Sequence, residues 1–246
     1  MTTDFFKKRY GHEVEGVWMP RVTAITSLTS RPFFAGAMKS ADWGNTVHTS
    51  VEKLLKGEEH ASQARIEPSL QAFKKWRETQ AVRILNPVTD IEAKVCDFEN
   101  GYIGTVDMVA EVLGKRGVVD LKTGNTIRDE YSLQTAAYMN AYNKGVPKKL
   151  QAETRWILRI DQYEECKGCA ARKKSKDGTE RISGGNDFCN HKWSSPMGEA
   201  EFLELEDYAE DLRAFLAAKE VWEWYYRAML KRVANYQKNV TQKVLL

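Results

Sequence analysis

The chain has 246 residues, of which 37 are Lys or Arg and 34 are Asp or Glu, so its formal net charge is +3. The 42% hydrophobic and 29% charged residues exclude a disordered or collagen-like chain, and the length suffices for a hydrophobic core without disulfides. No stretch approaches the roughly 20 apolar residues that span a bilayer, and the first residues lack the apolar run of a signal peptide.

The first third of the chain reads as a short extended segment followed by helices. Gly16 and Pro20 interrupt the extended segment. Beyond it, apolar residues recur at helical spacing, and Gly57 ends the first periodic run. The predicted elements are a strand-like run over 14–29, a helix from near residue 40 or 42 to 57, and a helix over 67–83.

After Asn86-Pro87 the apolar period changes from helical to two, which is typical of strands. Short Gly-containing turns separate these strands. The predicted elements are strands over 91–98, 102–113 and 117–122, a helix over 130–144, a strand over 153–160, a strand over 200–205 and a long helix over about 207–236. Segment 161–199 differs, being rich in Lys, Gly, Ser and Asp, and is predicted to be an inserted arm or long hairpin.

Three charged residues on neighbouring predicted strands are candidates for chemistry. Asp120 and Lys122 are two apart on one strand, so their side chains share a face. If the preceding strand pairs antiparallel through a tight turn, Asp107 reaches that same face. Two converging carboxylates form a site for a hard divalent cation, and a neighbouring lysine orients or deprotonates water and balances phosphate charge. The pattern predicts a metal-dependent phosphodiesterase.

Four short motifs follow one another along the chain. They are Gly44-Asn-Thr-Val-His48, Gly104-Thr-Val-Asp107, Asp120-Leu-Lys122 and Gln134-Thr-Ala-Ala-Tyr138. In this order they resemble the PD-(D/E)XK nuclease superfamily, specifically its RecB-like branch with phage and mitochondrial-type exonucleases. The segment from Pro20 to Thr26 is similar to the start of such members, although Arg21 stands where serine is common.

The resemblance implies a restriction-endonuclease-like α/β (α+β) fold, with a central mixed sheet flanked by helices and the arm 161–199 inserted in a single domain, 1–246. From the residues alone, a histidine at position 48 is more often a packed, hydrogen-bonded helix residue than a metal ligand, and Glu92 is equally a further ligand or an exposed edge residue. The family implies metal ligation by His48, Asp107, Asp120 and the Leu121 carbonyl, catalysis by Lys122 together with both acids, a further catalytic acid at Glu92, and support or DNA contact by Gln134 and Tyr138.

The arm holds three of the four cysteines. Cys166-Lys-Gly-Cys169 followed by Cys189-Asn-His191 offers three thiolates and an imidazole, which suits a tetrahedral structural zinc site. A loop without metal and an iron–sulfur cluster are the alternatives. In related CRISPR adaptation nucleases the first cysteine of the iron–sulfur cluster precedes the nuclease core. Here Cys96 lies inside the core and is expected to be a buried strand residue, which favours zinc over the cluster. The arm is also basic, and Lys167, Arg172, Lys173, Lys174 and Lys176 are candidates for DNA-backbone contact.

The sequence therefore predicts an Mg²⁺- or Mn²⁺-dependent deoxyribonuclease, exonucleolytic or directed at single strands or flaps, acting in recombination, repair or phage DNA processing. DNA is the expected partner, a membrane is not, and a helicase or recombination protein is a candidate partner. We expect an intracellular location, in a bacterial or phage-infected cytoplasm. The alternatives are a non-catalytic nucleic-acid-binding module organised by the zinc arm, and a nuclease subunit of a helicase or CRISPR-adaptation complex.

Overall fold

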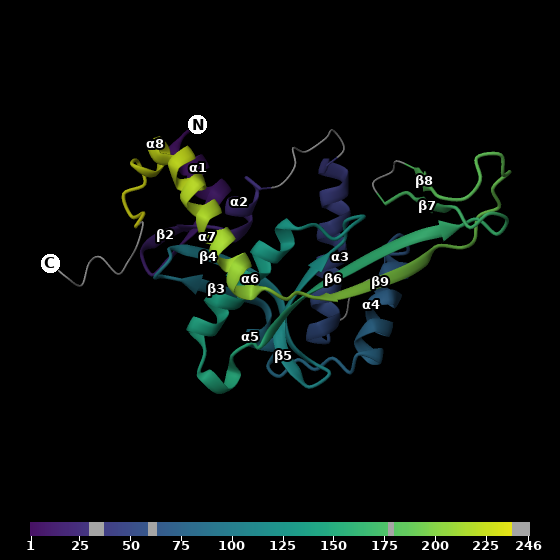
Figure 1. Ribbon diagram of the computed structural model, residues 1–246, viewed down its shortest axis with the longest axis horizontal. Coiled ribbons are helices and arrows are strands. Elements are labelled where there is room, and N and C mark those ends of the chain that lie inside the picture. Colours follow the sequence, from purple (N-terminus) through teal and green to yellow (C-terminus); the bar gives the residue numbers. More distant parts are fainter. Residues whose placement is uncertain (30–36, 59–62, 177–179, 238–246) are drawn as a thin grey trace.

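The computed structural model describes residues 1–29, 37–58, 63–176 and 180–237 (Figure 1). The chain begins with a helix, a β-hairpin and a second short helix, which the sequence did not indicate. The hairpin turns at Glu15 and Gly16, both with left-handed backbones (φ 51° and 77°). The elements are α1 (Thr3–Tyr10), β1 (Gly11–Val14), β2 (Val17–Pro20) and α2 (Val22–Thr26).

The expected strand-like run over 14–29 is therefore wrong beyond Pro20. The β-branched residues of α2 favour extended structure by local propensity. In the fold, however, Val22, Ile25 and Thr26 are all buried. Tertiary packing of this helix outweighs its weak local preference.

A mixed β-sheet forms the centre of the molecule, as the sequence predicted. Strands β3, β4 and β5 form an antiparallel meander, β5 and β6 are parallel, and both β7 and β9 pair antiparallel with β6. The parallel step needs a crossover, which α6 supplies. The strands are β3 (Ile91–Asp97), β4 (Tyr102–Val112), β5 (Lys115–Lys122), β6 (Thr154–Glu165), β7 (Arg172–Lys174), β8 (Arg181–Ser183) and β9 (Met197–Glu204).

Helices cover both faces of this sheet, which confirms the predicted fold class (Figure 1). The predicted helix over 67–83 ends early, at Thr79, and the long C-terminal helix breaks at Tyr226. No helix in the described parts of the chain has the length and apolarity that crossing a membrane requires. The helices are α3 (Ala37–Lys56), α4 (Glu67–Thr79), α5 (Pro87–Asp90), α6 (Glu130–Gly145), the 3₁₀ helix η1 (Lys148–Leu150), α7 (Tyr208–Tyr225) and α8 (Arg227–Leu230).

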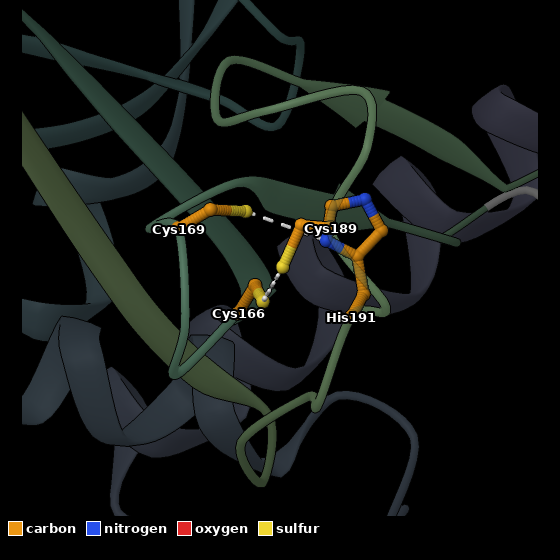
Figure 2. A group of neighbouring side chains, drawn as sticks. All are labelled: Cys166, Cys169, Cys189 and His191. Atoms are coloured by element: carbon orange, nitrogen blue, oxygen red, sulfur yellow. Dashed lines mark hydrogen bonds between the residues drawn. The ribbon is translucent and has the colours of Figure 1, made fainter.

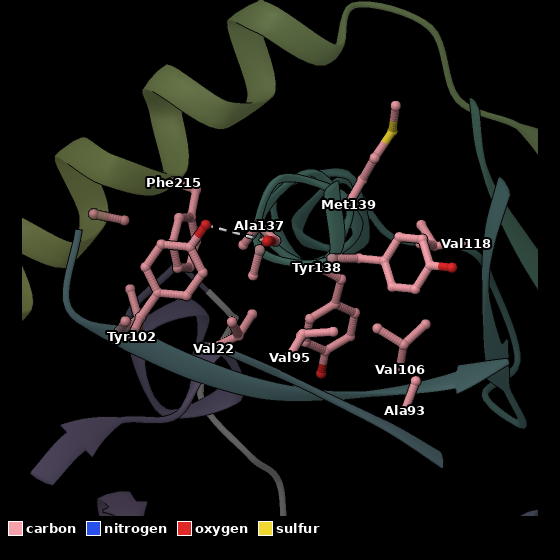
Figure 3. Packing of buried hydrophobic residues seen from close by; sticks show 14 of the residues in the cluster. Val22, Ala93, Val95, Tyr102, Val106, Val118, Ala137, Tyr138, Met139 and Phe215 are labelled. Atoms are coloured by element: carbon pink, nitrogen blue, oxygen red, sulfur yellow. Dashed lines mark hydrogen bonds between the residues drawn. The ribbon is translucent and has the colours of Figure 1, made fainter. Parts of the chain in front are cut away.

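The buried apolar residues form two clusters on opposite sides of the sheet. One joins β3, β4 and β5 to α2, α6 and α7, with Tyr138 and Phe215 among its large side chains (Figure 3). The hydroxyl of Tyr102 donates to the Ala137 carbonyl there, at 3.1 Å. The other cluster packs α3 and α4 against the sheet through residues such as Val47 and Phe73. The sheet therefore has α6 on one face and α3 on the other, and each helix can direct side chains toward the strands between them.

The predicted arm is built on a long two-stranded hairpin. Strand β6 continues to Glu165, five residues beyond its predicted end, and β9 begins at Met197. Their register runs from Trp156 opposite Glu204 to Tyr163 opposite Met197. Strands β7 and β8 extend this ribbon, so the arm is regular at its base (Figure 1). Its residues 177–179 lie outside the described residues.

The aromatic C-terminal helix is divided between packing and exposure. Trp222 is fully buried against Phe6, with ring centroids 6.0 Å apart. Trp224 and Tyr225 are exposed. The periodicity of α7 explains the division, because neighbours in a helix point to different faces.

Candidate active site

The two candidate acids come together where β4 and β5 stop pairing. Their ladder ends at Met108 opposite Val119. One residue further, Asp107 Oδ2 accepts a hydrogen bond from the backbone N–H of Leu121 at 2.6 Å, so a side chain replaces the missing ladder partner. The N–H and C=O of a strand residue lie on the same edge, so the Leu121 carbonyl is directed toward Asp107 as well. The side chains of Asp120 and Lys122 lie together on one face of β5.

Each acid of the site has its own cationic partner. His48, from α3, places its Nδ1 3.3 Å from Asp107 Oδ1. The Lys122 ammonium lies 2.6 Å from Asp120 Oδ2. In the described part of the chain the four arm residues are the one group in which three or more ligand atoms converge. At this site the ligand atoms approach in pairs, because unscreened carboxylates repel each other and attract the nearest cation.

These residues fit a divalent cation by their donor chemistry. Carboxylate oxygens are the ligands that Mg²⁺ and Mn²⁺ prefer, and one imidazole is compatible with Mn²⁺. Octahedral ligands at about 2.1 Å lie about 3.0 Å from their neighbours, and the His48 to Asp107 separation of 3.3 Å is close to that value. Asp120 lies beside His48 and Asp107, and its carboxylate contacts Lys122 and Gln134.

An amide from α6 fixes the second acid and the lysine together. Gln134 Nε2 donates to Asp120 Oδ1 at 2.9 Å and to the Tyr138 hydroxyl at 3.0 Å. Its Oε1 accepts from Lys122 at 3.3 Å. The Tyr131 ring lies under the same ammonium, with its centroid 4.6 Å from Nζ. The sequence analysis missed Tyr131, although its spacing of three and seven residues from Gln134 and Tyr138 marks one helical face.

Two glycines allow the elements of the site to approach closely. A Cβ at Gly104 would lie 2.4 Å from the Tyr138 ring, so only glycine leaves room for this tyrosine against β4. A Cβ at Gly44 would meet the Thr123 hydroxyl at 3.0 Å, where α3 passes the residue that follows Lys122. The glycines of two predicted motifs thus have a steric reason.

Glu92 lies opposite Asp107 at an irregularity of β3. Regular pairs flank it, Ile91 with Met108 and Ala93 with Val106. Its own backbone is left-handed (φ 51°), an uncommon conformation for a residue other than glycine. As a result Ile91 packs into the α3 cluster while Ala93 packs into the α6 cluster, although a regular strand would put both on one face. The irregularity lets β3 contribute to both cores at the level of the site.

Burial and neighbouring charges shift the pKa values of these groups in different directions. Burial raises the pKa of Asp120 to about 6, with Lys122 opposing and Asp107 adding to the rise. Burial also acts to raise the pKa of Asp107, but His48, Lys122 and the Leu121 N–H outweigh it and hold the pKa below its usual value. The two acids therefore differ in proton affinity, which is typical of functional carboxylate pairs.

The Glu92 carboxyl has the more unusual environment. Burial, then repulsion by Asp107 and Glu52, raises its pKa to about 7. Because this folded-state pKa lies above that of the unfolded chain, the ionised carboxylate opposes folding. The penalty is absent below the unfolded value of 4.5, grows as the pH rises toward 7, and is complete above it.

Glu92→Gln is therefore expected to stabilise the metal-free protein at about pH 8 by on the order of 1 kcal/mol, reduced from the full shift because the side chain is partly exposed. At about pH 4 it should leave stability unchanged. Urea unfolding with a chelator at both pH values measures this. The exposed Glu153→Gln is the matched control, expected to have no effect at either pH. An equal gain for Glu92→Gln at both pH values would contradict the electrostatic explanation.

A cavity of about 480 Å³ opens over the site. His48, Asp107, Asp120, Lys122, Gln134 and Tyr138 all line it, whereas Glu92 does not. A further part of its wall carries three basic side chains from the N-terminal elements and β3, namely His12, Arg21 and Lys94, together with the acidic Glu13. The sequence analysis missed this wall, because nothing local relates residues 12 and 94 before the fold brings them together.

The four metal-ligand candidates of the arm lie together as well (Figure 2). The ligand atoms of Cys166, Cys169, Cys189 and His191 are all within 4.8 Å of one another. Cys96 lies elsewhere, on β3, paired with Ile103. It is half-buried rather than buried as expected, because it faces away from the side of β3 that packs Val95 into the core.

The structure does not present the arm lysines as free charges. Lys174 and Lys176 contact the buried Asp161 at 2.6 and 2.8 Å. Lys173 pairs with Glu164 at 2.8 Å, and Arg172 with Glu199 at 3.1 Å. Of the five basic residues proposed for DNA contact, four are thus engaged within the arm and Lys167 is exposed. The acids that neutralise them come from β6 and β9, outside the basic run itself.

Comparison with known families agrees with this geometry. The model of the PD-(D/E)XK nuclease superfamily matches residues 27–224. This range includes all four predicted motifs and the arm. No curated protein matches the chain significantly.

Proposed function

Because the chain belongs to the PD-(D/E)XK nuclease superfamily, we propose that it hydrolyses phosphodiester bonds of DNA at the site around Asp107, Asp120 and Lys122. The observation that carries this proposal is the meeting of His48, both acids, Lys122 and Gln134 on the wall of one cavity. A protein that kept this fold only as a scaffold would have no physical need for one buried and one half-buried acid beside a lysine.

The roles of the residues follow from their positions. His48, Asp107, Asp120 and the Leu121 carbonyl would hold Mg²⁺ or Mn²⁺, and the cation would supply Lewis-acid chemistry that polarises the scissile phosphate and lowers the pKa of water. Two carboxylates, Asp120 and Asp107, outweigh burial and raise the pKa of Lys122, so this residue is an ammonium that donates hydrogen bonds. It orients the attacking water and balances charge on the phosphate. Gln134 and Tyr138 keep Asp120 and Lys122 in place.

The substrate is proposed from the shape and charge of the cavity. The β1–β2 hairpin and α2 form part of its wall, so the site lies beneath the N-terminal elements. About 480 Å³ is the size of a pocket for a small ligand, which favours a strand end, a single strand or a flap over an intact duplex. The Gln134-x-x-x-Tyr138 motif, whose two side chains are hydrogen-bonded, supports assignment to the RecB-like branch, and the proposed role in recombination, repair or phage DNA processing rests on that assignment.

Digestion of end-labelled single-stranded, duplex, flap and closed circular DNAs with Mn²⁺ or Mg²⁺ tests the proposal. We expect cleavage of linear single strands and flaps that a chelator abolishes, and no cleavage of closed circles. Cleavage of circles would make the enzyme an endonuclease. Cleavage of RNA alone would overturn the DNA assignment, and inactivity on every substrate with both metals would overturn the nuclease proposal itself.

The basic wall of the cavity is proposed to contact the DNA backbone. Lys94 is exposed and lines the same cavity as Asp107 and Asp120. Lys94→Ala should weaken binding of single-stranded DNA and lower the slope of log K against log salt by about 0.7, because one phosphate contact is lost. Anisotropy titrations at several salt concentrations with Ca²⁺ measure the slope. Lys149→Ala, which removes an equally exposed lysine on η1, is the matched control, and an equal change in both would refute a specific contact.

A further inference from the structure

The cysteine cluster of the arm lies outside the nuclease site and needs its own explanation. Cys166 Sγ and Cys189 Sγ are 3.8 Å apart, and Cys169 Sγ is 3.4 Å from His191 Nδ1 (Figure 2). A disulfide joins sulfurs at about 2.05 Å, so this spacing is not that of a bond. All four cysteines of the chain are free.

Two separations within the cluster match a tetrahedral metal site, and all four ligand atoms lie within 4.8 Å of one another. Zinc binds thiolate at about 2.3 Å and imidazole at about 2.0 Å, which puts two thiolates about 3.8 Å apart and a thiolate and an imidazole about 3.5 Å apart. Both separations in the cluster agree with these values. We infer that Cys166, Cys169, Cys189 and His191 form a structural zinc site that closes the arm.

The donor set favours zinc over the other metals. Three thiolates and one imidazole are soft ligands that do not suit Mg²⁺ or Mn²⁺. Four protein ligands complete a tetrahedron and leave no position for a substrate, which is the mark of a structural site. A four-cysteine iron–sulfur cluster lacks its fourth thiolate, because Cys96 lies on β3, three strands away from β6 in the sheet.

The position of the cluster explains what the metal does. Cys166 and Cys169 follow the end of β6, while Cys189 and His191 precede β9, so one ion joins the two strands of the hairpin beyond their last pair. Between 166 and 196, no described residue belongs to either apolar cluster of the molecule. A metal replaces the missing core as the source of order there. The His191 ring also packs on Trp193, with centroids 4.7 Å apart.

The ordered arm reaches the nuclease site through its base. Asp161 is fully buried and contacts Arg159 at 2.8 Å in addition to Lys174 and Lys176. The Lys176 ammonium also donates to the carbonyl of Thr123 at 2.6 Å, and Thr123 directly follows Lys122. Zinc therefore holds an arm whose base supports the end of the strand that carries Asp120 and Lys122.

The test is the metal content of the full chain, purified without chelator and measured by plasma mass spectrometry. We expect close to one zinc per chain, and a loss of at least about fivefold in Cys169→Ser and His191→Ala. Cys96→Ser and Asp120→Asn are the controls and should keep their zinc. Zinc that persists in Cys169→Ser but is lost in Asp120→Asn would place the ion at the nuclease site and overturn the inference.

A second measurement on the unaltered chain covers the case in which the cysteine variants do not fold. Cobalt titrated into the zinc-free protein should give the thiolate charge-transfer and tetrahedral ligand-field bands. Zinc should also slow proteolysis within 166–196. Stoichiometric iron with labile sulfide, or no uptake of zinc and cobalt, would overturn the assignment. Neither measurement involves DNA, so the result is independent of the proposed nuclease activity.

Discussion

Asp120→Asn is expected to abolish strand cleavage, lowering kcat/KM by at least about 10³-fold, the scale for loss of a full electrostatic stabiliser. Asp120 is almost fully buried, and Lys122 and Gln134 both contact its carboxylate. The amide of the variant has the same shape but no charge to bind a cation. Initial rates on a labelled single strand with saturating Mn²⁺ measure the effect.

Measurements of metal binding distinguish loss of the Asp120 charge from misfolding of the variant. Calorimetric titration should show that Asp120→Asn loses Mn²⁺ affinity at the nuclease site while its zinc content and unfolding transition persist. Asp129→Asn, which changes an exposed carboxylate at the start of α6, makes the same change in charge and should keep full activity. Cleavage by Asp120→Asn within threefold of the unaltered rate would refute the assignment of the acid.

The sheet that carries this acid was predictable from local sequence. Period-two patterns and short Gly-containing turns predicted β3, β4 and β5 within two residues at each end. Since an antiparallel register follows from a tight turn, the approach of Asp107 to the Asp120 strand was predictable as well. The arm cysteines were grouped correctly, because Cys-x-x-Cys followed by Cys-x-His is itself a short-range signal.

Features that depend on distant packing were not predictable. The left-handed backbone of Glu92 arises because β3 must serve two cores, and no local residue pattern requires it. The short α2 helix contradicts its own propensity. The arm lysines appeared available for DNA because their partners, among them Asp161 and Glu199, lie up to 27 residues away in sequence. A run of like charges therefore predicts a free charged surface only where no residue distant in sequence neutralises it.

The site combines several arrangements that are unfavourable in the metal-free protein. The pKa of Asp120 is raised by burial, and Glu92 is both strained and repelled by Asp107. Such costs persist where the surrounding fold fixes the geometry, and a bound cation relieves the repulsion between the acids. We therefore expect Mn²⁺ to raise the midpoint of thermal unfolding of the unaltered protein but not of Asp120→Asn.

Lys122→Met is expected to lower kcat by about 10²- to 10⁴-fold while leaving a folded, metal-binding protein. The methionine side chain keeps the length of the lysine stem over Tyr131 but cannot donate to water or phosphate. The ammonium also lowers the pKa of Asp120, so its removal raises that pKa above its value of about 6. Because protons compete with the cation for Asp120 in the metal-free protein, the acid limb of the pH dependence of Mn²⁺ affinity should then move to higher pH, a change that a purely structural role would not produce.

Lys122→Arg distinguishes the charge from the position of the ammonium. Arginine restores the positive charge and should return the acid limb toward its original pH. Its planar guanidinium has a different shape and hydrogen-bond geometry from an ammonium held 2.6 Å from Asp120 and 3.3 Å from Gln134, so kcat should remain low. Full recovery of kcat in Lys122→Arg would mean that a nearby charge suffices, and undiminished kcat in Lys122→Met would remove Lys122 from the catalytic site.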